Sequence, residues 1–403
     1  MTTSRFIRDQ FIAFLDLGHA NCRLVVMAPD LSFTRSYSAP MAGFQRGKVT
    51  DAAAFSAMAH SLAVEAKLTT LKYRAIVNIP DIHTRNLVQT IRHRTSGLYR
   101  STDYRSILDT SADCGGGELD EVIDTLILSA RMDDEPLDPL AFGSSGRDVV
   151  VQLMLATHPK IILADILAGL NDAGLEISEF RSNGFGLGRG LKSLRPEAEN
   201  AVLLDIGHSS TTGCLVVGGV LHQVFSVAAG SQHMTKDIMT GLASSREEAE
   251  SLKVTYGLNI PTGGLTPQED PLRNIQTMHR YLRPRVSEIL SLSAKHFAIY
   301  SRSLDGGLLL CGNGSALLGL SAQTTKTLGV SAPFICQLTQ ASAMSFVGVP
   351  LKAGSAAVDS SWLSTLSHIR SLASEISAYR VETDSRPLSK LRPLWTWISE
   401  LSR

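Results

Sequence analysis

The chain has 403 residues, of which 44% are hydrophobic and 19% charged, as in a globular protein large enough for two or more subdomains. Lys and Arg together number 38, and so do Asp and Glu, so bulk charge gives no reason to expect a nucleic-acid partner. Five scattered cysteines without metal-ligand spacing fit a reducing cytoplasm, and no apolar run approaches the roughly 18–20 residues that span a bilayer.

After a polar leader over residues 1–10, an apolar strand ends in Asp16-Leu-Gly18-His19. The polar turn Ala20-Asn21 leads into a second apolar strand up to Met27, and a third strand is expected over residues 31–37. A buried strand that carries a carboxylate and a glycine turn to its end is how a sheet presents a phosphate or metal site. An Asp at a strand end can also be a simple turn residue.

The same pattern returns at residues 201–235. An apolar strand ends in Asp205-Ile-Gly207-His208, the turn Ser209-Ser210 follows, and two more strands come before Gly230. Two copies of one unit suggest two similar half-molecules that face each other, each with one carboxylate at a shared cleft. Because the pattern occurs twice, it is harder to interpret both Asp16 and Asp205 as simple turn residues.

Between the two copies, Asp51 caps an expected helix over residues 52–66, whose inward face we assign to Phe55, Met58, Leu62 and Ala63, and a strand follows at 74–79. The character of the chain changes over residues 81–158. We expect a loop at 110–118, an acidic amphipathic helix at 119–132 and a strand at 148–156. A helix at 159–174 should turn Ile161, Ile162, Ile166, Leu167 and Leu170 inward. The glycine-rich stretch 183–190 is better explained by close helix packing than by a dinucleotide fingerprint.

In the second half we expect helices at 234–243 and 245–254, the latter opened by a capping pattern from Ser244 to Glu247. Glu250 and Lys253 share a face of that helix, either as a nucleotide contact or as an ordinary exposed salt bridge. A loop at 259–274, a helix at 275–300 (Ile289, Leu290, Leu292 and Phe297 inward) and a strand at 308–310 follow. Next come Gly312, Asn313 and Ser315, with a helix beginning at 316.

The C-terminal part contains an expected polar helix at 361–378, a linker at 379–389 and an amphipathic helix at 390–403. One stripe of that last helix holds its apolar side chains, with Trp397 beside it: Leu391, Leu394, Trp395, Ile398 and Leu401. Tryptophans with flanking basic residues are typical of a helix in a membrane interface. The alternative is a terminal helix that packs on its own core.

The order of these motifs resembles the bacterial cell division protein family FtsA, within the actin-like ATPase superfamily. The resemblance rests on the two Asp-x-Gly turns, the Gly312-Asn313-Gly-Ser315 segment and the run from Gly218 to Gly257. The segment from Phe346 to Pro350 and the C-terminal amphipathic stretch also fit it, so that it covers nearly the whole chain. It implies an α/β, actin-like fold with two similar halves around a nucleotide cleft. The domains would be residues 1–80, completed by about 159–195 and 345–378; an FtsA-type inserted subdomain at 81–158; and residues 196–344, with a smaller subdomain at about 235–295.

The resemblance also implies ATP and magnesium as cofactors. Asp16 and Asp205 would hold the magnesium ion through water. The phosphates would lie against the backbone of both turns: Gly18, His19, Ala20, Asn21, Gly207, His208, Ser209 and Ser210. Gly312, Asn313 and Ser315 would flank the nucleoside opposite Glu250 and Lys253, and Gly230 would border the site. We considered His19 and His208 as a metal pair and favour them as donors to phosphate. No catalytic residue is assigned, and any ATPase activity would be weak.

The implied function is a cytoplasmic adaptor that lies peripherally on the inner face of the cell membrane at the division septum. It would bind ATP, form filaments, bind the C-terminal tail of the tubulin-like protein FtsZ and contact other division proteins. Several turn positions depart from the family pattern, among them His19, Asn21 and His208-Ser-Ser210. A nucleotide-free scaffold with the same fold is therefore one alternative. A small-molecule kinase of the same superfamily is another, but the sequence offers it no general base.

Overall fold

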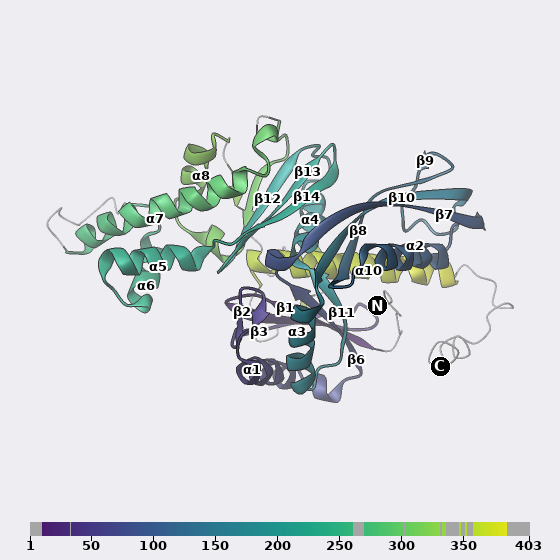
Figure 1. Ribbon diagram of the computed structural model, residues 1–403, viewed down its shortest axis with the longest axis horizontal. Helices are drawn as coiled ribbons and strands as arrows, with labels where there is room; N and C mark the ends of the chain where they lie inside the picture. Colours follow the sequence, from purple (N-terminus) through teal and green to yellow (C-terminus); the bar gives the residue numbers. More distant parts are fainter. Residues whose placement is uncertain are drawn as a thin grey trace.

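We describe a computed structural model of the chain that covers residues 10–384 except 33, 261–269, 302, 331–332, 336–345, 348–350 and 353–357. Two mixed sheets lie on either side of a pair of central helices, and a third, antiparallel sheet projects from one end (Figure 1). The expected α/β, actin-like arrangement with two similar halves is confirmed.

The first sheet has the spatial order β11-β6-β1-β2-β3-β17. Its strands are β1 (Phe11–Leu17), β2 (Asn21–Met27), β3 (Thr34–Pro40), β6 (Tyr73–Ile79), β11 (Ile177–Ser182) and β17 (Leu351–Lys352). The first three strands are an antiparallel meander, while β6 and β11 add in parallel. Because nearly every residue of β1, β2 and β6 is buried, this sheet is covered on both faces. Helices α1 (Ala52–Glu65) and α3 (Lys160–Asp172) cover one of them (Figure 1).

The second sheet repeats the plan, with the order β14-β13-β12-β15-β16. Its strands are β12 (Ala201–Ile206), β13 (Thr211–Val217), β14 (Val220–Val227), β15 (Gly307–Cys311) and β16 (Phe334–Ile335). Again an antiparallel meander is extended by a parallel strand, here β15 beside β12. Four helices accompany this half: α5 (Ser231–Leu242), α6 (Arg246–Tyr256), α7 (Asp270–Ala294) and α8 (Leu320–Leu328).

Helices α4 (Asn183–Leu194) and α10 (Leu363–Asp384) pack against each other between the two sheets (Figure 1). The glycines of α4 permit this, since a Cβ on Gly186 would lie 2.3 Å from Ser364 Oγ and one on Gly190 would lie 2.6 Å from Ser367 Oγ. Close helix packing, as expected for residues 183–190, is therefore confirmed. The largest hydrophobic core includes residues of both sheets and both helices, which holds the halves together at the base of the cleft.

The inserted part is a four-stranded antiparallel sheet in the order β7-β10-β8-β9. It comprises β7 (Arg85–Leu98), β8 (Asp120–Met132), β9 (Glu135–Pro136) and β10 (Ser145–Pro159), with α2 (Ser101–Gly115) packed on it (Figure 1). Tyr99, Tyr104 and Ile107 belong to a separate core beneath α2. The short elements of the chain are β4 (Phe44–Gln45), β5 (Lys48–Val49) and the 3-10 turns η1 (Leu68–Thr70), η2 (Asp81–His83), η3 (Ala298–Tyr300), η4 (Asn313–Ala316) and η5 (Ser360–Trp362).

The helix expected at 119–132 is wrong, because this stretch is strand β8. Its apolar residues Val122, Ile123, Leu126 and Ile127 have helical spacing, but β8 pairs with β10 along its length. Two irregularities in that pairing, between Gln152 and Leu153 and between Ala156 and Thr157, shift the face on which following side chains lie. Strict alternation is therefore lost and a helical period is imitated. The loop expected at 110–118 is also partly wrong, since α2 continues to Gly115.

Other boundaries differ by smaller amounts. Ile161 is 74% exposed instead of buried, as the first-turn residue of α3 that points away from the core. The capping box of α6 joins Ser245 and Glu248, one residue later than expected. Residues 316–319 precede α8, which begins at Leu320, and α7 begins at Asp270, inside the expected loop. Helix α10 runs to Asp384, so residues 379–384 are helical where a linker was expected.

Helix α7 ends at Ala294, before the expected end at residue 300. The other helices and strands expected within the described residues are present, and the helix expected at 390–403 lies outside them. Asp51 caps α1 by accepting a hydrogen bond from the N–H group of Ala54 at 3.0 Å, and Phe55, Met58, Leu62 and Ala63 are buried as expected. Among the described residues, no helix is long and apolar enough to span a membrane.

Candidate functional site

The two Asp-x-Gly turns occupy equivalent positions in the two sheets. Asp16 lies near the end of β1 and pairs in register with Arg23 of β2. Asp205 lies near the end of β12 and pairs in register with Thr212 of β13. Each aspartate is thus seven positions before a partner on the returning strand, and the internal repeat seen in the sequence is a structural repeat.

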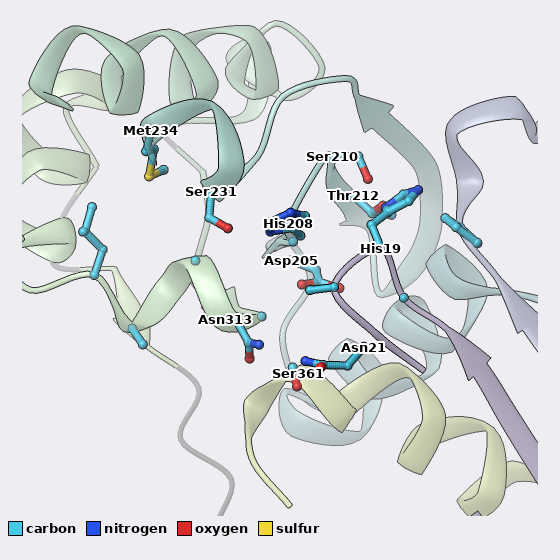
Figure 2. Close-up of a pocket in the computed structure, with 18 of the residues that line it drawn as sticks. His19, Asn21, Asp205, His208, Ser210, Thr212, Ser231, Met234, Asn313 and Ser361 are labelled. Atoms are coloured by element: carbon cyan, nitrogen blue, oxygen red, sulfur yellow. The ribbon is translucent and has the colours of Figure 1, made fainter. Parts of the chain in front are cut away.

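A cavity of about 420 Å³ lies between these turns. Figure 2 shows His19 and Asn21 of the first turn on one side, Ser231, Met234 and Asn313 of the second half on the other, and Asp205 and His208 between them. Helix α6 contributes Arg246, Glu250 and Lys253 to the same wall. The cavity therefore joins both halves of the molecule.

Most of the site residues expected from the sequence line this cavity. They are Asp16, Gly18, His19, Ala20, Asn21, Asp205, Gly207, His208, Ser210, Glu250, Lys253, Gly312 and Asn313. Three expected residues do not line it: Ser209, Gly230 and Ser315. Ser209 is buried, and the Ser315 hydroxyl donates to the carbonyl oxygen of Gly312 at 2.7 Å, which stabilises that turn instead. Gly230 packs on the backbone of the second turn.

Two glycines are required by close approaches at the cavity wall. A Cβ on Gly18 would lie 2.6 Å from the carbonyl oxygen of Asn21, across the first turn. Gly312 has a φ of +79°, and a Cβ there would lie 2.0 Å from Asp205 Oδ1. The segment after β15 can therefore reach the second carboxylate only with glycine at this position.

Asp16 is engaged by neighbouring side chains. Arg23 Nη1 donates to Asp16 Oδ2 at 2.9 Å, and Asn78 Nδ2 donates to Asp16 Oδ1 at 2.8 Å. Only 7% of Asp16 is exposed. The negative charge that this turn would offer to a cation is therefore already balanced within the first sheet.

Asp205 has no such partner charge in direct contact among the described residues. Burial raises the pKa of its carboxyl group to about 6, with a further increase from the charge of Asp16. The positive charge of Arg23 and a hydrogen bond from Asn183 act in the opposite direction. At neutral pH Asp205 is mainly ionised, so it is the carboxylate whose charge the cleft leaves available.

The two equivalent histidines are neutral at physiological pH. Burial lowers the pKa of His19 to about 4, helped by His208 and His83. The Nε2 atom of His19 accepts a hydrogen bond from the N–H group of Gly47 at 2.9 Å, so its proton resides on Nδ1. Burial and the charges of Arg246 and Lys253 lower the pKa of His208. Each histidine can thus serve as a neutral hydrogen-bond donor; this expected role remains a prediction.

Helix α6 brings a buried lysine to the opposite end of the cavity. Lys253 Nζ donates to Glu250 Oε2 at 2.7 Å and to Thr235 Oγ1 at 2.8 Å, although only 7% of the lysine is exposed. Burial raises the pKa of Glu250, but hydrogen bonds from Lys253 and Thr235 outweigh this and lower it. Glu250 and Lys253 therefore form part of the cavity wall, and their contact with Thr235 connects α6 to α5. They are not an ordinary exposed salt bridge on one helix.

The expected magnesium site requires a test against this donor set. Mg²⁺ in proteins is bound by one or two carboxylates together with several waters and substrate phosphates. Asp16 has a donor on each of its oxygens and a guanidinium in direct contact, so it is a poor partner for a second cation. The residues present do not fit an ion held jointly by Asp16 and Asp205.

The sequence reasoning missed several residues of the cavity, above all Arg23, Arg246, Thr212 and Ser361. A signal for Arg23 was present. It is the one charged residue of β2, whose other residues after Asn21 are apolar, and the hairpin register places it across from Asp16. Ser361 precedes α10 and comes from a distant part of the chain, so no local pattern indicates it. The expected membrane residues Leu391, Leu394, Trp395, Trp397, Ile398 and Leu401 lie outside the described residues.

Comparison with known proteins agrees with this architecture. The family model described as "Cell division protein FtsA" matches residues 202–384. The cell division protein FtsA of Bacillus subtilis (strain 168) is 25% identical over 347 residues, which are 79% of this chain and 77% of that protein.

Among solved structures, a chain of the PilM-PilN type IV pilus biogenesis complex is similar with a TM-score of 0.56 and 19% identity, over 91% of this chain and 98% of that one. MreB 5 of Spiroplasma citri bound to AMPPNP is similar with a TM-score of 0.50 and 11% identity, over 93% of this chain and 99% of that one.

The chain therefore has an actin-like fold with a cleft between its two halves. The match over the second half and the similarity to the Bacillus protein point to the same family. The chain resembles FtsA proteins as a divergent relative.

Proposed function

We propose that this protein binds ATP in the cavity between its two halves and acts as an FtsA-type adaptor in cell division. The observation that carries the proposal is the convergence of both Asp-x-Gly turns, the segment after β15 and helix α6 on one cavity of about 420 Å³. The phosphate chain would lie between the two turns, near Gly18 and Gly207. The nucleoside would lie between Lys253 and Asn313.

Nucleotide binding is tested by titration with a fluorescent ATP analogue and displacement by unlabelled ATP. The variant Asn313→Trp places a bulky ring on an exposed residue of the cavity wall and should weaken binding by about tenfold or more. Lys326→Trp, on the exposed face of α8, is the matched control and should bind as the wild type does. If the folded wild type binds no nucleotide, the protein is a nucleotide-free scaffold with the same fold.

We further propose that residues 390–403 form an amphipathic helix that holds the protein on the inner face of the cell membrane at the septum. There it would assemble into filaments, bind the C-terminal tail of FtsZ and contact other division proteins. A single short helix binds weakly, so assembly of several copies would be needed for stable attachment.

The membrane proposal is tested by co-sedimentation of the full chain with vesicles that contain anionic lipid. The double variant Trp395→Glu, Ile398→Glu interrupts the apolar stripe and should abolish co-sedimentation. Ser399→Glu, which lies outside the stripe, should retain most of it. Equal sedimentation of the double variant and the wild type would contradict the anchor, and the same vesicle assay with FtsZ added tests the adaptor role.

A further inference from the structure

Arg23 is a buried cation in the wall of the cleft. It lies opposite Asp16 in the pairing of β1 with β2, and only 9% of it is exposed. Its Nη1 atom donates to Asp16 Oδ2 at 2.9 Å and its Nη2 atom to Ser361 Oγ at 2.8 Å. The ring of Trp362 lies 5.7 Å from the guanidinium carbon. Contacts from β1 and from the segment that opens α10 therefore fix the position of the charge.

The same guanidinium borders the first turn. A Cβ on Gly18 would lie 3.2 Å from Arg23 Nη1, so the glycine leaves room for the guanidinium as well as for the turn. Arg23 lines the cavity together with Asp16 and Asp205. Its charge also lowers the pKa of Asp205, although burial has the larger and opposite effect. A fixed positive charge thus acts on both carboxylates of the cleft.

This cation breaks the symmetry between the two halves. The position equivalent to Arg23 in the second half is Thr212, which pairs with Asp205 in the same register and carries no charge. The remaining neighbours of Asp16 and Asp205 in their parallel strands are Asn78 and Cys311, both neutral. Among the described residues, the positive charge in direct contact with either carboxylate is therefore supplied by Arg23 of the first sheet.

We propose that the Arg23 guanidinium takes the place of a divalent cation in this cleft, so that the phosphates of a nucleotide bind without magnesium. The proposal rests on the nucleotide binding proposed above. A guanidinium offers a permanent positive charge and planar N–H donors that suit phosphate oxygens, which are the neutralising and orienting roles a magnesium ion would have. Arg246, which lines the same cavity beside His208, supplies a second cation.

The wild type gives the first test. The fluorescent ATP analogue is titrated once with excess magnesium chloride and once with excess EDTA. The dissociation constants should agree within about threefold. A loss of affinity of about tenfold or more in EDTA overturns the inference while leaving nucleotide binding intact. Absence of binding under both conditions overturns the proposed function and the inference with it, so the two failures are distinguishable.

The variant Arg23→Thr gives the second test, because it copies the neutral pairing of Asp205 with Thr212. In EDTA it should bind the analogue about 10- to 100-fold more weakly than the wild type, as expected when a charge-assisted hydrogen bond is lost. Magnesium should restore part of that loss. Arg74→Gln removes another partly buried arginine, which lies on β6 and pairs with Ile12 at the start of β1, away from the first turn. This variant should leave binding independent of magnesium. Equal binding by Arg23→Thr and the wild type in EDTA overturns the inference.

A titration with Mn²⁺ completes the design. Mn²⁺ is added to the wild type and followed by electron paramagnetic resonance, and no protein-bound ion should appear whose signal changes when the ATP analogue is added. Arg23→Thr should gain such a site at Asp16 and Asp205. A cleft-bound Mn²⁺ ion in the wild type overturns the inference. If the variant fails to fold, the EDTA comparison and the Mn²⁺ titration on the wild type still decide the question.

Discussion

Asp124 of β8 accepts two hydrogen bonds from Arg189 of α4, from Nη1 at 3.2 Å and from Nη2 at 3.1 Å. Arg181 adds a third at 3.0 Å, and the backbone N–H group of Ser182 a fourth at 3.2 Å. The carboxylate is completely buried. One aspartate thus links the inserted sheet to β11 and to the central helix that supports the cleft.

Replacement of Asp124 by Asn should therefore destabilise the whole protein. It would leave the Arg189 guanidinium without its anion and Arg181 with Glu179 alone, and breaking a buried pair typically costs about 3–5 kcal/mol. Urea unfolding followed by circular dichroism measures the change in free energy. Asp148→Asn in β10 is the matched control, because its pairing with Arg94 is 3.7 Å long and exposed, and the expected cost is about 0–1 kcal/mol. Equal effects of the two substitutions would contradict this role of Asp124.

The contacts of Asp124 also predict that the protein loses stability in acid. Burial raises the pKa of Asp124, but the charges of Arg189 and Arg181 outweigh it and hold the pKa well below its usual range. Because the folded-state pKa is depressed, this stabilisation is present above the unfolded pKa of about 4 and is lost as pH falls below it. The difference in stability between the wild type and Asp124→Asn should therefore shrink steadily as the pH is lowered below about 4.

Asp205 should have the opposite effect on how the stability of the protein depends on pH. Its folded-state pKa is raised to about 6 by burial, above the value of about 4 in the unfolded chain. Ionisation therefore opposes folding, and stability falls as pH rises between these values and stays lower above them. Asp205→Asn should accordingly stabilise the nucleotide-free protein at pH 7.5 by up to about 3 kcal/mol, with a smaller gain near pH 4.

Asp305→Asn is the control for Asp205, since its exposed carboxylate accepts hydrogen bonds from the N–H groups of Glu199 and Asn200 and has a lowered pKa. It should destabilise the protein at pH 7.5, with an effect that fades in acid. Thermal unfolding over a pH series measures both variants. A loss of stability in Asp205→Asn at pH 7.5 would contradict this prediction. It would mean that the carboxylate stabilises the fold, whereas we expect it to reduce stability in the absence of ligand.

The fold was predictable because its defining pattern is local and occurs twice. Each copy contains its own strand, carboxylate and tight turn, so the hairpins around Asp16 and Asp205 could be recognised without knowledge of their partners. Strand β8 was not predictable in this way, since its irregular pairing with β10 disguises the alternation. The burial of helix α10 was missed for another reason. Its residues Ser364, Ser367 and His368 look like an exposed polar face in the sequence but are buried against α4 and β11.

The same distinction applies to the site. The residues of the turns were predictable because a turn of four or five residues brings them together. The charge balance of the cleft was not predictable from the sequence. It depends on Asn78 from a neighbouring strand and on Ser361, which is 338 positions from Arg23. Long-range contacts of this kind leave no spacing in the sequence.

Gly230 tests how tightly the second turn is held. The N–H groups of Ser231 and Gln232, at the start of α5, donate to the carbonyl oxygens of Gly207 and His208 at 2.9 and 2.8 Å. A Cβ on Gly230 would lie 2.6 and 2.8 Å from those same oxygens. Gly230→Ala should therefore push α5 away from the turn and cost about 1–3 kcal/mol in urea unfolding. Gly117→Ala, where a Cβ meets nothing within 4 Å, should be close to neutral.

Lys253 tests the nucleoside end of the cavity. Lys253→Met keeps the apolar part of the side chain but removes the donor that contacts Thr235 and Glu250. Because the side chain of Glu250 is 48% exposed, water can replace the lysine there and the loss of stability should be small. If the ammonium group also contacts nucleotide, affinity for the fluorescent ATP analogue should fall by about tenfold or more. Lys236→Met, an exposed lysine on α5, should leave it unchanged. Unaltered affinity in Lys253→Met together with reduced stability would mean that the lysine only joins α5 to α6.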